Sequence, residues 1–198
     1  MNKKILVLGA GMSASGLIKY LLDKSEQYNW HITVADKDID LVKSKLNNHK
    51  NSTHTTFDIN DAKILAELVS GADLVISLMP ATLHPIVARE CLKQEKHLFT
   101  ASYVSPEMRS MHQEAYNKGL IFFNESGVDP GLDHMSAMKV IDEIKEKGGK
   151  LISFTSNTGG LIAPECDNNP WNYKLTWNVR NVILAGQAGA KFIQNGKY

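Results

Sequence analysis

The strongest constraint on the fold is the alternation of short β-branched runs with longer helix-like stretches over the first 125 residues. This alternation is typical of βαβ units, which build a parallel sheet with helices on its faces. The run Ile5–Leu8 is apolar throughout, as is typical of a central strand covered on both faces. The sequence therefore predicts an α/β fold.

Short β-branched and apolar runs predict six strands in this part of the chain, joined by five helices. The expected strands are Ile5–Leu8, His31–Ala35, Thr53–Phe57, Leu74–Leu78, His97–Thr100 and Leu120–Phe123. The expected helices are Ser13–Leu22, Asp38–Leu46, Asp61–Ser70, Leu83–Gln94 and Pro106–Lys118. Proline at the first turn of the last helix and Gly119 just past its end mark its boundaries.

A GxGxxA motif joins the first strand to the first helix and consists of Gly9, Ala10, Gly11, Met12, Ser13 and Ala14. Gly9 permits a tight turn, Gly11 lets the backbone approach a pyrophosphate, and Ala14 allows close packing of helix on strand. The first N–H groups of the helix and its dipole favour the same anion. The motif predicts a Rossmann-type doubly wound parallel sheet that binds a dinucleotide, rather than a glycine turn without a ligand.

Asp36 ends the second strand, 22 residues after Ala14. An acidic side chain at this place accepts hydrogen bonds from the adenosine ribose hydroxyls and repels a 2′-phosphate. No arginine follows it, and Lys37 is interpreted either as a phosphate partner or as a solvated surface charge. The expected cofactor is therefore NAD rather than NADP.

Small and hydroxylated residues follow the fourth and fifth strands, where an open parallel sheet binds its ligands. Ser77 and Leu78 at the first place, and Ala101, Ser102 and Tyr103 at the second, are the expected lining of the nicotinamide and substrate site. Taken alone, Ser102 is more simply a cap or turn hydroxyl and Tyr103 a rim aromatic.

His84 follows the fourth strand and has two interpretations. It is either a proton shuttle or, more simply, a packed residue at the start of a helix.

The alternation of strand-like and helix-like stretches ends after Glu125. We place the boundary between a domain of residues 1–125 and one of residues 126–198 there. Turn residues 127–131 precede an expected helix, Leu132–Lys147, whose apolar residues recur at helical spacing and predict a core face. Further on we expect strands at Leu151–Asn157 and Tyr173–Trp177 and a helix at Val179–Ala188. This second part is interpreted as the start of an α+β substrate domain.

Composition excludes several classes of protein. Lysine plus arginine number 22 against 21 acidic residues, so a nucleic-acid partner is not expected. No apolar run reaches the roughly 18–20 residues of a membrane helix, and the N-terminal segment enters a strand rather than a signal-peptide core. Cys91 and Cys166 lie outside any metal-binding spacing, and the pair Asp133-His134 lacks further ligands. We expect a cytoplasmic protein without a metal.

Several stretches together resemble the saccharopine dehydrogenases of the glutamate-forming branch. The stretches that carry the resemblance are DLVISLMP (73–80) with LHP (83–85), TASY (100–103), GVDPGLDHM (127–135), and GGLIAPE (159–165) with NNP (168–170) and YK (173–174). The resemblance runs from Ile5 to Gly196, and the aspartate-proline-glycine and glycine-glycine motifs are its most specific parts.

The resemblance implies an NAD(P)-dependent oxidation of saccharopine to L-glutamate and 2-aminoadipate 6-semialdehyde in lysine metabolism. It also places residues of this chain at cofactor positions, namely Gly9, Gly11, Ser13, Asp36, Leu78, Ala101 and Asp129. Ser102 and Tyr103 fall at substrate positions. Tyr103, Asp129 and proton exchange of the substrate amine itself are the alternatives for the acid–base step.

The chain departs from this family in length, because members are much longer and their substrate domain continues past the residue matched by Tyr198. The chain is accordingly interpreted as a fragment, a truncated product, or an NAD-binding module without full activity. A carboxyalkyl-polyamine dehydrogenase is the nearest enzymatic alternative. The oligomeric state is left open, with a homodimer among the options.

Overall fold

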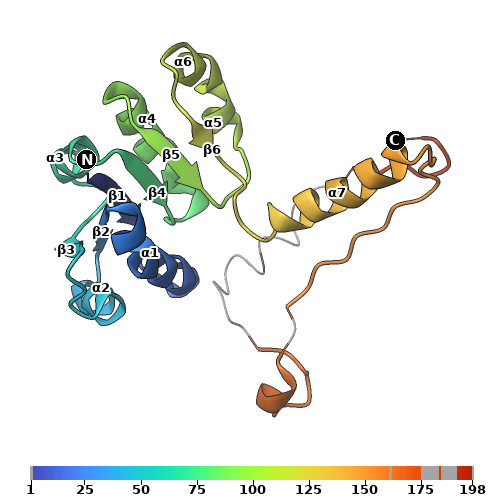
Figure 1. Ribbon diagram of the computed structural model, residues 1–198, viewed down its shortest axis with the longest axis horizontal. Helices are drawn as coiled ribbons and strands as arrows, with labels where there is room; N and C mark the ends of the chain where they lie inside the picture. Colours follow the sequence, from blue (N-terminus) through green and yellow to red (C-terminus); the bar gives the residue numbers. More distant parts are fainter. Residues whose placement is uncertain (1, 161, 175–182, 184–190, 198) are drawn as a thin grey trace. The chain divides into compact units, whose positions relative to one another are not determined.

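The computed structural model describes residues 2–160, 162–174, 183 and 191–197. The chain divides into two compact units, Met1–Thr158 and Gly159–Tyr198. The first unit holds a six-stranded sheet in the order β3-β2-β1-β4-β5-β6, and every neighbouring pair of strands is parallel (Figure 1). The predicted Rossmann-type fold is confirmed. The predicted domain boundary near Glu125 lies within the first compact unit, and it stays a prediction.

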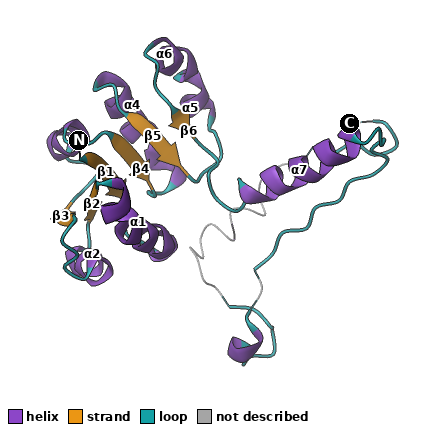
Figure 2. Ribbon diagram, viewed as in Figure 1, coloured by secondary structure: helices purple, strands orange, loops and turns teal. Residues whose placement is uncertain are grey.

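Most of the predicted elements are present (Figure 2). The strands are β1 Lys3–Leu8, β2 Trp30–Asp36, β3 Ser52–Thr56, β4 Leu74–Ser77, β5 His97–Thr100 and β6 Phe122–Phe123. The α-helices are α1 Ser15–Tyr28, α2 Ile39–Leu46, α3 Ala62–Ser70, α4 His84–Lys93, α5 Pro106–Ser110, α6 His112–Asn117 and α7 Leu132–Glu146. Short 3-10 helices lie at η1 Met12–Ala14, η2 Ala81–Leu83 and η3 Pro164–Cys166.

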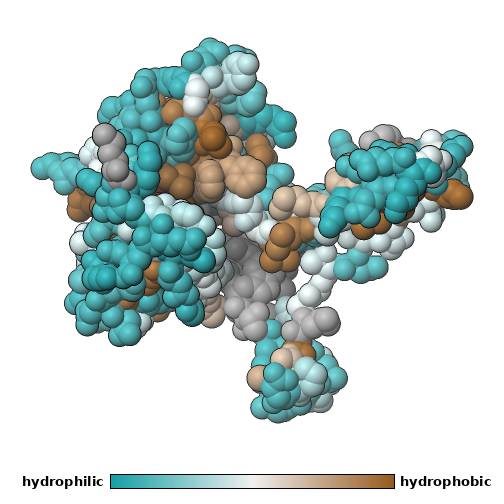
Figure 3. Space-filling model, viewed as in Figure 1, coloured by the Kyte–Doolittle hydropathy of each residue, from teal (hydrophilic) through white to brown (hydrophobic). Residues whose placement is uncertain are grey.

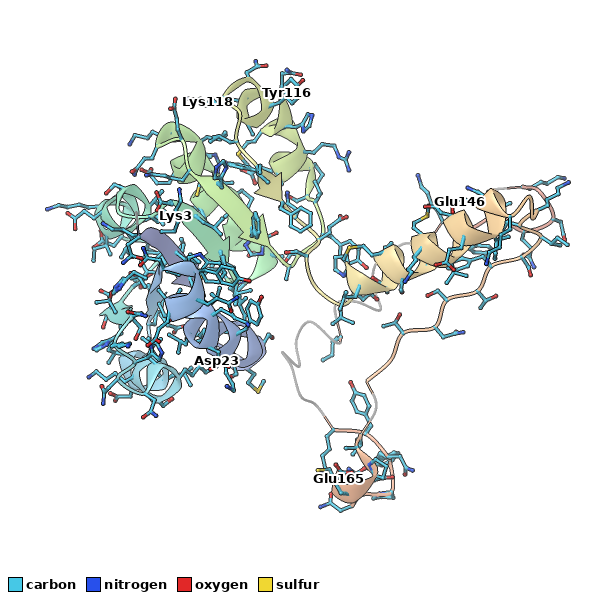
Figure 4. The ribbon with its side chains drawn as sticks, viewed as in Figure 1. Lys3, Asp23, Tyr116, Lys118, Glu146 and Glu165 are labelled. Carbon is cyan, nitrogen blue, oxygen red and sulfur yellow. The ribbon has the colours of Figure 1, made fainter. Side chains whose placement is uncertain are left out.

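The sheet is covered on both faces, which explains the unbroken apolar run in β1. Alternate side chains of a strand point to opposite faces. Leu6 and Leu8 pack into one buried cluster with residues of α3, α4, α5 and α6. Ile5 and Val7 pack into a second cluster with residues of α1 and α2. The ion pair of Lys19 and Asp23 is exposed on α1, with Lys19 Nζ 2.6 Å from Asp23 Oδ2, and Asp23 is labelled in Figure 4.

Side-chain caps fix where several helices begin. The Asp61 side chain accepts hydrogen bonds from the backbone N–H groups of Lys63 and Ile64, and Asp38 caps α2 in the same way. Each of these helices therefore begins one residue later than predicted, because the predicted first residue is its cap. At the other end of α1, Asn29 adopts a left-handed conformation with φ of 55°. This cap lies seven residues beyond the predicted end, Leu22, since the last turns of α1 carry few apolar residues.

The segment Pro106–Lys118 is two helices instead of the predicted one. Met111 separates α5 from α6, and its N–H group donates to Met108 O, a three-residue turn rather than an α-helical one. The sixth strand is also shorter than predicted, since only Phe122 and Phe123 pair with β5. Leu120 instead packs against the buried cluster beneath α4.

The region after Glu125 departs further from the predictions. No strand forms over Leu151–Asn157 among the described residues. The apolar stripe of α7 is not core, because Leu132 is 60% exposed, Met135 53% and Met138 48%, and hydrophobic atoms reach the surface over this helix (Figure 3). The expected strand Tyr173–Trp177 and helix Val179–Ala188 fall largely outside the described residues. None of the described helices is long and apolar enough to cross a membrane.

The buried cluster beneath α3 and α4 predicts a large effect for a cavity in β5. Leu98 is fully buried, so Leu98→Ala should lower the free energy of unfolding by about 2–5 kcal/mol. The matched change Leu132→Ala on the exposed face of α7 should alter it by less than about 0.5 kcal/mol. Urea denaturation followed by circular dichroism measures both. Equal effects of the two changes would contradict the burial described here.

Candidate functional site

The glycine-rich turn packs against the end of β4, at the point where the strand order reverses. Gly9 has φ of +101°, and a Cβ atom built on it would lie 3.0 Å from the backbone carbonyl carbon and oxygen of Leu78. Leu78 is held there because its N–H group donates to Leu8 O at 2.8 Å. Gly9 is therefore required both for its backbone conformation and for the close approach of two chain segments.

Asp36 lies beside the same turn. Its Oδ2 accepts a hydrogen bond from Ala10 N at 2.6 Å, and its Oδ1 accepts one from Asp38 N at 3.0 Å. Since a carboxylate has about four acceptor sites, two backbone bonds fix its orientation and leave capacity for further donors. The end of β2 thus presents an oriented negative charge next to the end of β1.

The start of the first helical segment leaves room for an anion. Met12 and Ser13 are exposed in η1, and no side chain caps η1 or α1. A Cβ built on Gly11 meets no atom within 4 Å among the described residues, so internal packing does not explain the glycine. A small residue beside the first N–H groups of the helical segment fits the backbone approach to a pyrophosphate, and the residues present fit a dinucleotide.

Lys45 is a residue of this region that the motif analysis missed. Its Nζ donates to Gly11 O at 2.6 Å and to Ser15 Oγ at 2.8 Å. Partial burial lowers the pKa of Lys45, and the nearby Asp36 carboxylate opposes that shift. No sequence signal predicts this contact, because it depends on how α2 packs beside α1.

A buried histidine joins the ends of β4 and β5. Ser77 Oγ lies 2.9 Å from His84 Nδ1, and His84 Nε2 lies 2.9 Å from Ser102 Oγ. Ser77 is fully buried and His84 is 3% exposed, while Ser102 is half-buried. Burial lowers the pKa of His84 to about 4, so the ring is neutral near pH 7. Of the two interpretations of His84, the packed residue at a helix start is the one observed.

The loops after β5 and β6 are joined to each other by hydrogen bonds. Glu125 N donates to Ser102 O, and Val104 N donates to Glu125 Oε1 at 3.0 Å. Gly127 packs on Ala101, whose carbonyl oxygen would lie 3.3 Å from a Cβ built on Gly127. These contacts place the TASY stretch directly beside the turn that begins α7.

Tyr103 and Asp129 form a pair across these two loops. The Tyr103 hydroxyl donates to Asp129 Oδ1 at 2.5 Å. This hydrogen bond raises the pKa of Tyr103 to about 12, with smaller contributions from burial and neighbouring carboxylates. Tyr103 is 60% exposed, so the pair faces solvent and is accessible to a ligand.

Asp129 also lies near Asp133 and His134, with one ligand atom of each residue within 4.8 Å of the others. His134 Nδ1 is 2.7 Å from Asp133 Oδ1, and that same oxygen accepts a hydrogen bond from Gly131 N. The protein's own groups thus already engage one oxygen of the Asp133 carboxylate. The expectation that no metal binds stays a prediction.

The structure brings the predicted site residues together in two groups. Gly9, Ala10, Asp36 and Leu78 meet at the ends of β1, β2 and β4, with Gly11, Met12 and Ser13 continuing the same turn. Ala101, Ser102, Tyr103 and Asp129 lie on the loops after β5 and β6. The Ser77 side chain is buried and points to His84. The roles of these residues in binding stay predictions.

Comparison with known proteins identifies the family. The family model described as the saccharopine dehydrogenase NADP binding domain matches residues 5–123, and that of the saccharopine dehydrogenase C-terminal domain matches residues 127–198. The chain belongs to the saccharopine dehydrogenase family. The predicted resemblance is therefore confirmed.

Individual relatives support this assignment. The chain is 44% identical over 193 residues to a protein of Schizosaccharomyces pombe named saccharopine dehydrogenase (NADP(+), L-glutamate-forming). The alignment covers 98% of this chain and 42% of that protein. An apo saccharopine dehydrogenase (L-Glu forming) from Saccharomyces cerevisiae superposes with a TM-score of 0.83 at 37% identity, covering 93% of this chain and 40% of that one. The alpha-aminoadipic semialdehyde synthase of Arabidopsis thaliana is 37% identical, with 99% of this chain and 20% of that protein covered. The chain thus spans about two fifths of the fungal relatives.

The comparisons also bear on the cofactor. A nucleotide cofactor of the NAD(P) class is supported by the matched domain. The names of that domain and of the fungal relatives favour NADP over the predicted NAD.

Gly9 and Gly11 should respond differently to the same substitution. Gly9→Ala places a Cβ 3.0 Å from backbone atoms at a positive φ, so the free energy of unfolding should fall by about 1–3 kcal/mol. Gly11→Ala meets open space at a negative φ and should leave stability within about 0.5 kcal/mol of the original. Urea midpoints measure both. A larger loss for Gly11→Ala than for Gly9→Ala would contradict the described turn.

The Tyr103–Asp129 bond predicts a titration that depends on the carboxylate. Ultraviolet absorbance of the chain minus that of Tyr103→Phe should show the Tyr103 phenol ionising with a pKa of about 12. In Asp129→Asn the phenol should ionise nearer to the ordinary value of about 10, because a neutral acceptor no longer opposes the phenolate. An unchanged Tyr103 pKa in Asp129→Asn would show that the bond is absent in solution.

Proposed function

We propose that the protein containing this chain is an NAD(P)-dependent saccharopine dehydrogenase that forms L-glutamate and 2-aminoadipate 6-semialdehyde. The observation that carries the proposal is the placement of Tyr103 bonded to Asp129 on the loops after β5 and β6, at the carboxyl edge where the glycine-rich turn also lies. In open parallel sheets that edge binds the ligands. The names of the relatives supply the substrate, saccharopine.

The residues of this chain divide the work of binding and chemistry. A dinucleotide held here would supply the hydride acceptor for oxidation of the carbon beside the secondary amine of saccharopine, and water would then split the resulting imine into the two products. The turn Gly9–Ser13 and the start of α1 would hold the pyrophosphate. Asp36 would accept hydrogen bonds from the adenosine ribose, and Leu78 and Ala101 would border the nicotinamide.

Asp129 is the proposed proton acceptor for the substrate amine. Tyr103 is a poor base near pH 7, because its pKa is about 12 and its proton is committed to Asp129. Asp129 is exposed and accepts the hydrogen bond of the Tyr103 hydroxyl on one oxygen, which leaves the other oxygen for an ammonium group. Tyr103 would orient the carboxylate, and Ser102 would contact the substrate beside it.

Turnover tests this assignment. The protein should produce NADH or NADPH when supplied with saccharopine and the oxidised coenzyme, and L-glutamate should accumulate in equal amount. A related amine, such as a carboxyalkyl-polyamine, serves as the competing substrate. Reduction of coenzyme by that amine and not by saccharopine would overturn the substrate.

A dinucleotide-binding module without catalysis is the second candidate, because the chain spans only 42% of the relative from Schizosaccharomyces pombe. Calorimetry on the 198-residue chain separates the two functions. Binding of NADH without turnover favours the module, whereas turnover by this chain alone excludes it.

The preferred coenzyme is the finer part of the proposal. The names of the relatives favour NADP, whereas the local charge in this chain favours NAD. Asp36 is fixed by two backbone bonds beside the turn, and Lys37 Nζ is paired with Asp58 Oδ2 at 3.0 Å. A 2′-phosphate would therefore meet an oriented carboxylate and a lysine that already has a partner. We infer a preference for NAD.

The ratio of the two coenzymes measures this preference. Asp36→Ser should shift the ratio of Kd for NAD to Kd for NADP toward NADP by about tenfold or more, because the repelling charge is removed. Asp58→Ser releases Lys37 from its ion pair, so it should also shift the ratio toward NADP, but by less, because the Asp36 carboxylate remains. Tighter binding of NADP than of NAD by the unsubstituted chain would contradict the inferred preference.

The acid–base roles predict a graded loss of activity. Asp129→Asn should lower kcat by about 10²–10⁴-fold, the range for loss of a general base. Tyr103→Phe keeps the carboxylate and should lower kcat/KM by only about tenfold, as for one hydrogen bond. A greater loss of kcat/KM for Tyr103→Phe than for Asp129→Asn would exchange the two roles.

A further inference from the structure

Three side chains, Ser77, His84 and Ser102, are hydrogen-bonded in series, and this series bears on the role of the Ser102 hydroxyl in ligand binding. Its geometry links a hydroxyl inside the sheet to a hydroxyl at the edge of the site, with one imidazole between them. Both nitrogens of the ring are used. Because a neutral imidazole has one N–H donor and one bare acceptor nitrogen, the two serines cannot play the same role toward it.

The burial of Ser77 decides which nitrogen carries the proton. Among the described residues, His84 Nδ1 is the hydrogen-bond partner recorded for the Ser77 hydroxyl, and Ser77 is fully buried. If Nδ1 carried the proton, the Ser77 O–H would be left as a buried donor without an acceptor, which is costly. If Ser77 donates to a bare Nδ1, the Ser77 hydroxyl and the Nδ1 atom of His84 are both satisfied. The proton of the ring then lies on Nε2.

A proton on Nε2 fixes the role of Ser102. The ring donates to Ser102 Oγ. The hydroxyl proton of Ser102 is therefore not used in the bond to His84 and points to another acceptor. Ser102 is half-buried and directly precedes Tyr103 of the proposed site. The opposite tautomer would make Ser102 donate inward and present only lone pairs to a ligand.

We propose that His84 is a positioning residue that makes Ser102 a committed hydrogen-bond donor to an oxygen acceptor of the bound ligand. The proposal rests on the proposed function for the identity of the ligand. Two ligand groups share the required chemistry, namely a carboxylate of saccharopine and the carboxamide oxygen of the nicotinamide. His84 itself contacts neither group, because it lies 3% exposed behind Ser102.

Nitrogen-15 NMR of the histidine rings tests the tautomer without any ligand. In the unsubstituted chain, the His84 ring, assigned by its loss in His84→Gln, should be neutral at pH 7 with its proton on Nε2. Ser102→Ala should keep that tautomer, whereas Ser77→Ala should populate the second one. A proton on Nδ1 in the unsubstituted chain overturns the proposal even if the variants do not fold. An identical spectrum for Ser77→Ala also overturns it.

Calorimetry with two histidine variants tests the consequence for binding. The amide nitrogen of His84→Gln reaches the position of Nε2 and can still donate to Ser102, whereas His84→Asn mimics Nδ1 and releases Ser102. His84→Asn should weaken binding by about tenfold, and His84→Gln should stay within about threefold of the original. Circular dichroism and urea midpoints of the two variants show whether any loss comes from unfolding.

The choice of probes separates the two ligand groups. Weaker binding of NAD⁺ with unchanged binding of ADP-ribose assigns the acceptor to the carboxamide. Weaker binding of saccharopine in the presence of NADH, with NAD⁺ unchanged, assigns it to the substrate carboxylate. Unchanged binding of all three probes in His84→Asn overturns the role of His84. If the unsubstituted chain binds none of them, the proposed function fails for this chain, and the NMR result still decides the tautomer.

Discussion

The parallel pairing of β1 with β4 is the constraint on which the site depends. These two strands meet where the strand order reverses, so the helices that follow them cover opposite faces of the sheet and leave their carboxyl ends open. Gly9 has to pack against the Leu78 carbonyl at that point, and only a residue without a Cβ fits there at φ of +101°. The glycine of the motif is therefore explained first by the sheet and only then by a ligand.

Hydrogen bonding at the same edge follows from the need to satisfy buried polar groups. Among the described residues, no buried side-chain nitrogen or oxygen lacks a partner. Ser77, His84 and Ser102 achieve this by bonding to one another across β4 and β5, and Glu125 ties the next loop to Ser102. These loops are held in place by several strands, as the proposed binding of coenzyme and substrate side by side would require.

Sequence reasoning succeeded where a local rule determines the structure. Short β-branched and apolar runs predicted the strands, and the GxGxxA spacing predicted the turn, because both depend on neighbouring residues. It failed where the outcome depends on distant packing. The contact of Lys45 with Gly11 joins residues 34 apart, and the break at Met111 interrupts an otherwise helical pattern. The helical spacing of apolar residues in α7 was correct, but the inference that they form a core was wrong, since spacing gives a face without its partner.

The family assignment and the local chemistry answer different questions about the cofactor. A match over the whole dinucleotide domain determines the strand order and the position of the glycine-rich turn, features that NAD and NADP proteins share. The coenzymes differ only at the ribose 2′ position, which lies beside the end of β2, so the side chain there controls the preference. In this chain the residue at the end of β2 is Asp36, which is held by Ala10 N–H within the turn itself and is the proposed determinant of the preference. A preference can therefore change within a family while the fold and the reaction stay the same, because it depends on one charge rather than on the sheet.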